Sequence, residues 1–196
     1  SSASVAGADG HVFLDQKGTW VVSGSFAGSR VGGNAAAITR LQRSSARYFQ
    51  RPDATHLALA PDATSLAGWS GEVNVNRRAG SLLLDGALWA ISPGFEANDL
   101  GYSPHADRIG GHFGMIWRKT TPDRLSRSRD LTVLKWWTGN FGGDKQVDAT
   151  QVSLSTEFRN YWQAQLSGYY SWTTQDDRLT RGGPSAERLP LRQVSA

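Results

Sequence analysis

The sequence predicts an all-β fold, an antiparallel meander of about seven long strands. Three observations lead to this fold class. Apolar and polar residues alternate over stretches of about ten residues, tryptophans lie near the ends of these stretches, and shorter turns alternate with longer connections. The 22 glycines and 8 tryptophans, both above ordinary usage, fit the same interpretation.

The first two strands are expected at 19–28 and 66–77. Each stretch alternates apolar residues with serine, asparagine or glutamate, as in a strand with one dry and one wet face. The apolar positions of the two stretches are Trp20, Val22, Phe26, Trp69, Val73 and Val75.

The long connection at 31–65 contains the one expected helix, at 35–50. Ile38, Leu41 and Tyr48 or Phe49 lie roughly along one helical face, and Pro52 is expected to end the helix. We expect this helix to lie on a loop instead of in a core.

The next three strands, expected at 81–91, 108–118 and 130–141, alternate less regularly. The last of them carries Trp136 and Trp137 side by side, so one indole must face each side of the sheet. The most regular pair follows at 150–159 and 162–172. Only two residues separate this pair, which predicts a tight hairpin.

Composition excludes several classes of protein. The chain has no cysteine, so it holds no disulfide framework and no thiolate metal site. Its net charge of +4 rests on dispersed arginines and forms no basic tail. We expect no membrane-spanning helix and no attached signal peptide. Because the chain begins without methionine, we interpret it as a processed protein or a piece of a larger one.

Strand length favours a membrane location. Strands of about ten residues exceed the 5 to 6 residues common in soluble sandwiches and fit transmembrane strands, which are joined by short turns at one end. Valine, leucine, phenylalanine and tryptophan would then face lipid. The polar residues expected to line a hydrated interior are Glu72, Asn74, Asn76, Gln151, Glu157, Arg159, Gln163 and Gln165.

The stretch SPGFEANDLGYSPHADR, at 92–108, is the principal candidate site. Its carboxylates do not alternate as in a calcium loop, so we interpret it as a shaped loop whose acidic residues bind backbone amides or pair with arginines. We expect no catalytic, cofactor or metal residues in the chain. The residues expected to act in loop recognition are Phe95, Glu96, Asn98, Asp99, His105 and Asp107.

Two other functions are compatible with the residues. A secreted β-sandwich would bind glycans through its exposed tryptophans, and a hydrolase would use Glu96 and Asp99. The four histidines lack metal-ligand spacing, and the arginine-aromatic stretches are not expected to bind nucleic acid. The tryptophans considered for glycan binding are Trp20, Trp69, Trp89 and Trp117.

Five stretches, which together cover most of the chain, resemble a known family. They are LQRSSARYFQRPDA (41–54), TSLAGWSGEVNVNR (64–77), ISPGFEANDLGYSPHADRI (91–109), FRNYW (158–162) and DDRLTRGGPSAER (176–188). The sequence is similar to bacterial outer-membrane β-barrel domains of unknown function that follow a family 9 carbohydrate-binding-like module.

The resemblance implies a porin-like or TonB-dependent-receptor-like barrel in the outer membrane of a Gram-negative bacterium, without enzymatic activity. The chain, 1–196, would be an internal segment of a longer barrel. Its expected partners are outer-membrane lipid, the remaining strands or a partner polypeptide, and a saccharide or other small solute. Its expected roles are solute passage, docking of a surface partner or anchoring of an assembly.

Overall fold

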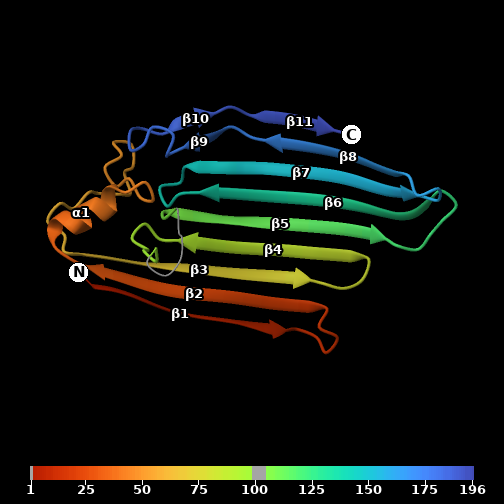
Figure 1. Ribbon diagram of the computed structural model, residues 1–196, viewed down its shortest axis with the longest axis horizontal. Helices are drawn as coiled ribbons and strands as arrows, with labels where there is room; N and C mark the ends of the chain where they lie inside the picture. Colours follow the sequence, from red (N-terminus) through yellow and green to blue (C-terminus); the bar gives the residue numbers. More distant parts are fainter. Residues whose placement is uncertain (1, 99–104) are drawn as a thin grey trace.

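A computed structural model of the chain describes residues 2–98 and 105–196. Within these residues one antiparallel sheet contains nine strands, ordered along the chain except for the last (Figure 1). The strands, in sheet order, are β1 (Ser2–Phe13), β2 (Trp20–Gly32), β3 (Ser65–Arg77), β4 (Leu82–Ile91), β5 (Arg108–Lys119), β6 (Ser126–Gly139), β7 (Lys145–Phe158), β8 (Gln163–Ser171) and β11 (Leu191–Ser195).

The two ends of the sheet differ (Figure 1). The turns that follow β1, β3, β5 and β7 lie at one end, here called the turn end. The other end, the loop end, carries the helix α1 (Ala35–Arg43) and a small pair of strands, β9 (Thr174–Asp176) and β10 (Ala186–Arg188). In the described part of the chain, no helix is long and apolar enough to cross a membrane.

The predicted all-β antiparallel meander is confirmed, and all seven expected strands are present. The count of seven was too low, because β1 and β11 also join the sheet. β1 is rich in alanine, glycine and serine, so its alternation of apolar and polar residues is weak. Its place in the sheet is fixed by continuous pairing with β2 from Ser2 to Phe13.

The expected helix at 35–50 was too long, because α1 ends at Arg43. Its start at Ala35 agrees with the expected range. Asn34 is the N-cap, and its side chain accepts a hydrogen bond from the Ala37 amide at 2.9 Å. At its end the Ser44 amide donates to Leu41, and the Phe49 amide donates back to Gln42. This folded-back chain, not Pro52, ends the helix.

The strand register separates the sheet into two faces of opposite character. Residues paired across neighbouring strands lie on the same face, so the register carries each face from β1 to β11. The apolar face includes Val22, Phe26, Trp69, Val73, Leu84, Leu88, Ile109, Phe113, Trp117, Leu131, Val133, Trp137, Val152, Leu154, Leu166 and Val194. The polar face includes Ser23, Ser25, Glu72, Asn74, Asn76, Asp85, His112, Asp130, Thr132, Gln151, Ser153, Glu157, Gln163 and Gln165.

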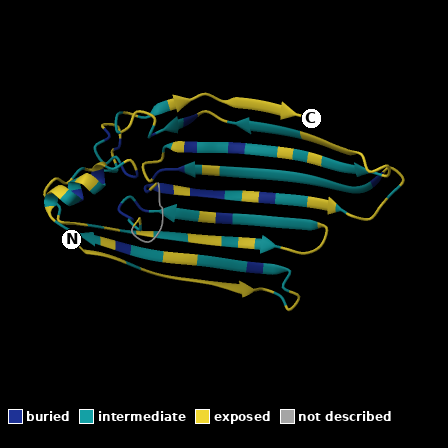
Figure 2. Ribbon diagram, in the orientation of Figure 1, coloured by how far each residue is buried: buried dark blue, intermediate teal, exposed yellow. Residues whose placement is uncertain are grey.

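The apolar face is uncovered over most of its area. Many of its large side chains are exposed, among them Phe26 at 59%, Leu88 at 64% and Leu166 at 53%. Most of the buried residues lie instead at the loop end, as Figure 2 shows. The helix residue Ile38 and the loop residues Ala54 and Phe95 belong to this loop-end core. The protein is therefore a one-layer sheet with a small packed cap.

The sheet is open in the described residues, with β1 and β11 as its edges. Every neighbouring pair is antiparallel, so these two edge strands run in the same direction, from the loop end to the turn end (Figure 1). Direct pairing of β1 with β11 would therefore be parallel, in contrast to the rest of the sheet.

Candidate recognition site at the long-loop end

The segment after β4 folds over the polar face at the loop end. The Trp69 amide donates to the Ser92 hydroxyl at 2.7 Å, and the Glu96 amide donates to the Ser29 hydroxyl at 2.8 Å. This close approach needs a glycine, because a Cβ on Gly68 would lie 2.1 Å from the Phe95 nitrogen. The loop is thus fastened to β2 and β3 by side chains and by backbone contact.

Glu96 has a buried cationic partner. Its carboxylate lies 2.7 Å from a guanidinium nitrogen of Arg47, and their side chains are 10% and 2% exposed. Arg47 also donates to the Phe95 carbonyl. Burial alone would raise the pKa of Glu96, but the Asn98 amide and the Arg47 charge lower it below its usual range. Hydrogen bonds from backbone amides or pairing with arginines were expected for the acidic residues of this loop, and Glu96 makes both.

Asp107 joins two other loops. Its carboxylate, on a residue only 1% exposed, lies 2.8 Å from His56 Nε2 and accepts a hydrogen bond from the Phe141 amide at 3.1 Å. Asp107 adopts a positive φ of 57°. Asp107 therefore connects the segment after α1 with the turn after β6.

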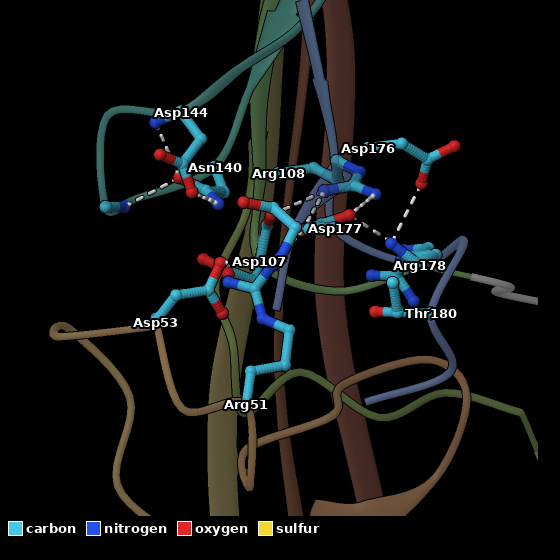
Figure 3. A network of polar contacts seen from close by, with 12 residues as sticks. Arg51, Asp53, Asp107, Arg108, Asn140, Asp144, Asp176, Asp177, Arg178 and Thr180 are labelled. Atoms are coloured by element: carbon cyan, nitrogen blue, oxygen red, sulfur yellow. Dashed lines mark hydrogen bonds and ion pairs between the residues drawn. The ribbon is translucent and has the colours of Figure 1, made fainter. Parts of the chain in front are cut away.

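Asp177 is the centre of the loop-end network (Figure 3). Arg108 donates to both of its carboxylate oxygens at 3.1 Å, in a bidentate pair, and Arg51 lies 3.1 Å away. The Asp177 side chain is only 6% exposed. Burial alone would raise the pKa of Asp177, but Arg108, with the charges of Arg178 and Arg51, lowers it below its usual range.

Arg178 fastens the chain after β9 to the rest of the loop end. Its guanidinium donates to the backbone carbonyls of Ser45, Ala46 and Ala106. Burial, followed by repulsion from Arg108, lowers the pKa of Arg178 to about 10, so it remains charged at neutral pH. Three segments distant in sequence therefore meet through one aspartate and its arginines. We call Arg51, Arg108, Asp177 and Arg178 the arginine cluster.

A pocket of about 820 Å³ opens beside the arginine cluster. Trp89 and Ile91 give it an apolar wall on the polar side of the sheet, and the exposed Arg188 pairs with Asp176 at its rim. Gly110 makes room for the Trp89 indole, because a Cβ there would lie 2.6 Å from the ring. An aromatic wall beside buried ion pairs suits a small polar solute better than a chemical reaction.

The expected loop-recognition residues are divided between structural and exposed positions. Phe95, Glu96 and Asp107 hold the loop in place, whereas Asn98 is exposed and His105 is an exposed residue at the pocket. Asp99 lies outside the described residues. Within residues 2–98 and 105–196, no group of acidic and histidine side chains has the arrangement of a metal site.

The tryptophans considered for glycan binding do not converge on one site. Trp20, Trp69 and Trp117 lie on the apolar face, on different strands, whereas Trp89 lies on the polar face at the pocket. The residues expected in the candidate site did not include Arg47, Arg51, Asp177 or Arg178. The available signal was that the stretches 41–54, 91–109 and 176–188, all quoted for the family resemblance, supply this network.

No protein family, curated protein or solved structure significantly matches the chain, so the family resemblance stays a prediction.

Proposed function

We propose that the chain forms part of the wall of a non-enzymatic outer-membrane β-barrel, with its apolar face toward lipid and its polar face toward a water-filled interior. The observation that carries this proposal is the division of a nine-stranded sheet, in which every strand but β11 is long, into an exposed apolar face and a polar face. A soluble sheet of this area would bury its apolar face against a second layer. In a bilayer the exposed apolar face would contact lipid and would need no second layer.

The dimensions of the apolar face support the proposal. On β5 the apolar face runs from Ile109 to Trp117. This corresponds to about 27 Å along the strand at about 3.4 Å per residue. A strand tilted by about 40° would span roughly 21 Å of bilayer, close to the apolar band of about 25 Å in outer-membrane barrels. Trp69 lies near the start of β3, Trp137 near the end of β6 and Trp172 directly after β8, so all three lie toward the loop end, where an aromatic girdle is expected.

The polar face suits contact with water and solute. Asp85 accepts a hydrogen bond from Asn74 at 2.8 Å and lies 2.9 Å from His112 Nε2, so a polar network crosses β3, β4 and β5. These side chains are partly exposed. With the arginine cluster and its pocket at the loop end, the polar face supports solute passage, with recognition at the mouth.

The absence of cysteine permits a direct test with single cysteines bearing a fluorophore. The chain is reconstituted in phosphatidylcholine vesicles with labels at Val152→Cys and Leu154→Cys on the apolar face, or at Gln151→Cys and Ser153→Cys on the polar face. The proposal expects quenching of the first pair by nitroxide lipids and of the second pair by aqueous iodide. Quenching that fails to alternate along β7 would overturn it.

The same labels separate the proposal from the glycan-binding β-sandwich. In a sandwich a second layer covers the apolar face, so neither lipid nor iodide reaches Val152 and Leu154. A folded, soluble monomer with that pattern would favour the sandwich.

A further inference from the structure

One row of residues on the apolar face carries charge. In the register of β6, β7, β8 and β11, Lys135 pairs with Thr150, Thr150 with Tyr170, and Tyr170 with Arg192. These four side chains therefore lie at one height on the same face, with a cation at each side. The next two rows toward the turn end are apolar on these strands and contain Val133, Val152, Val194, Leu131, Leu154 and Leu166.

The charges around this row leave a positive excess. Asp148 is shared by Lys135 and by Lys145, whose ammonium lies 2.7 Å from the carboxylate. Among the described residues Arg192 has no ion-pair partner. Three cations and one carboxylate give a local charge of +2. An apolar face with this excess of positive charge is complementary to an amphiphilic anion, which has a negative group and an apolar part.

Aromatic rings hold the cations in place. The Lys135 ammonium lies 3.9 Å from the centre of the Trp172 ring, and the Arg192 guanidinium lies 5.4 Å from the centre of Tyr170. The two rings contact each other edge to face at 4.7 Å. The positive charges are thus fixed at the level where aromatic residues meet lipid headgroups.

A hollow of about 500 Å³ adjoins the charged row. It lies at Gly168, where an added Cβ would meet nothing within 4 Å, between Val152 and Val194 in the neighbouring strands. Tyr170 and Trp172 line its loop-end side, and Arg192 lies at its rim. The hollow therefore places an apolar groove directly beside a cation.

We propose that this part of the apolar face binds an anionic lipid. The phosphate is held between Lys135 and Arg192, and an acyl chain lies in the groove at Gly168. The proposal rests on the proposed function, because it needs the apolar face to contact lipid. It adds that the contact is selective for negative headgroups over zwitterionic ones.

The test uses brominated lipids, which quench nearby fluorophores from the acyl chain. The chain is labelled at Leu166→Cys, close to the groove, or at Leu84→Cys, on the apolar face of distant β4. Phosphatidylcholine vesicles receive equal small fractions of brominated phosphatidylglycerol or brominated phosphatidylcholine. We expect the anionic lipid to quench the Leu166 label several-fold more strongly, and the Leu84 label to respond equally to both.

Separate substitutions then remove the positive charges and fill the groove. Lys135→Gln and Arg192→Gln should each reduce the preference for the anionic lipid by about fivefold. Gly168→Leu should reduce quenching by filling the groove while the charges remain. Arg30→Gln is the matched control, because Arg30 is an exposed cation on the same face near the loop end, on distant β2.

The outcomes distinguish this inference from the proposed function. Equal quenching of the Leu166 label by both lipids, or an equal effect of Arg30→Gln, would overturn the lipid site while leaving a lipid-facing sheet intact. If neither lipid quenches either label, the lipid-facing sheet itself is wrong, and the lipid site falls with it.

Discussion

Replacement of Asp177 by asparagine tests whether the arginine cluster holds the loop end together. The substitution keeps the size of the side chain and removes its charge. Arg51 and Arg108, whose side chains are 1% and 10% exposed, would then remain buried without their shared carboxylate. Breaking a buried pair by removing one partner costs about 3 to 5 kcal/mol. Arg178 keeps its three carbonyl acceptors, so we expect a loss of about 3 kcal/mol.

The assay has two readouts. Urea unfolding of the reconstituted chain gives the change in the free energy of unfolding, and trypsin cleavage after Arg178 or Arg181 reports release of the segment after β9. The matched control is Glu157→Gln, which breaks a partly exposed pair with Arg127 and should cost about 0 to 1 kcal/mol. If Asp177→Asn costs no more than this control and leaves cleavage unchanged, the cluster does not hold the loop end.

Three further predictions concern the same region. Because the folded-state pKa of Asp177 is lowered, the stability that its carboxylate contributes is complete above its unfolded pKa of about 3.9 and is lost as pH falls through the folded-state pKa. The free energy of unfolding should therefore decrease below about pH 4, and this decrease should be smaller in Asp177→Asn. Gly68→Ala should cost about 1 to 3 kcal/mol by forcing the loop off β3, whereas Gly168→Ala, in open space, should cost nothing, as urea unfolding would show; equal costs would contradict the close approach. Arg47→Met should cost about 3 to 5 kcal/mol by leaving Glu96 buried and unpaired, and should speed proteolysis of the loop after β4; an unchanged rate would show that this pair does not fasten it.

The strands were predictable where side-chain alternation was strong. The stretch 150–159 has a period of two that fits only a strand, and β7 covers most of it. Trp136 and Trp137 do face opposite sides, because neighbouring residues of a strand always do. β1 escaped prediction because alanine and glycine give little contrast between its two faces.

The candidate site was predictable only in part. The loop sequence predicted that Glu96 would bind a backbone amide or an arginine, but not that the arginine would be Arg47. Its partner lies 49 positions earlier in the sequence, and Arg108 lies 69 positions before Asp177. A single sequence has no periodicity that connects such distant loops.

The sequence by itself determined seven strands of the sheet, their two faces and the difference between the turn end and the loop end, because these depend on neighbouring residues and on connection length. Only the tertiary structure decided that α1 ends at Arg43 and that β1 and β11 form the edges. It also decided which charges meet in the arginine cluster and along the row from Lys135 to Arg192. Pairing between distant segments is set by strand register and loop closure, and the register brings charges together that the linear sequence keeps apart.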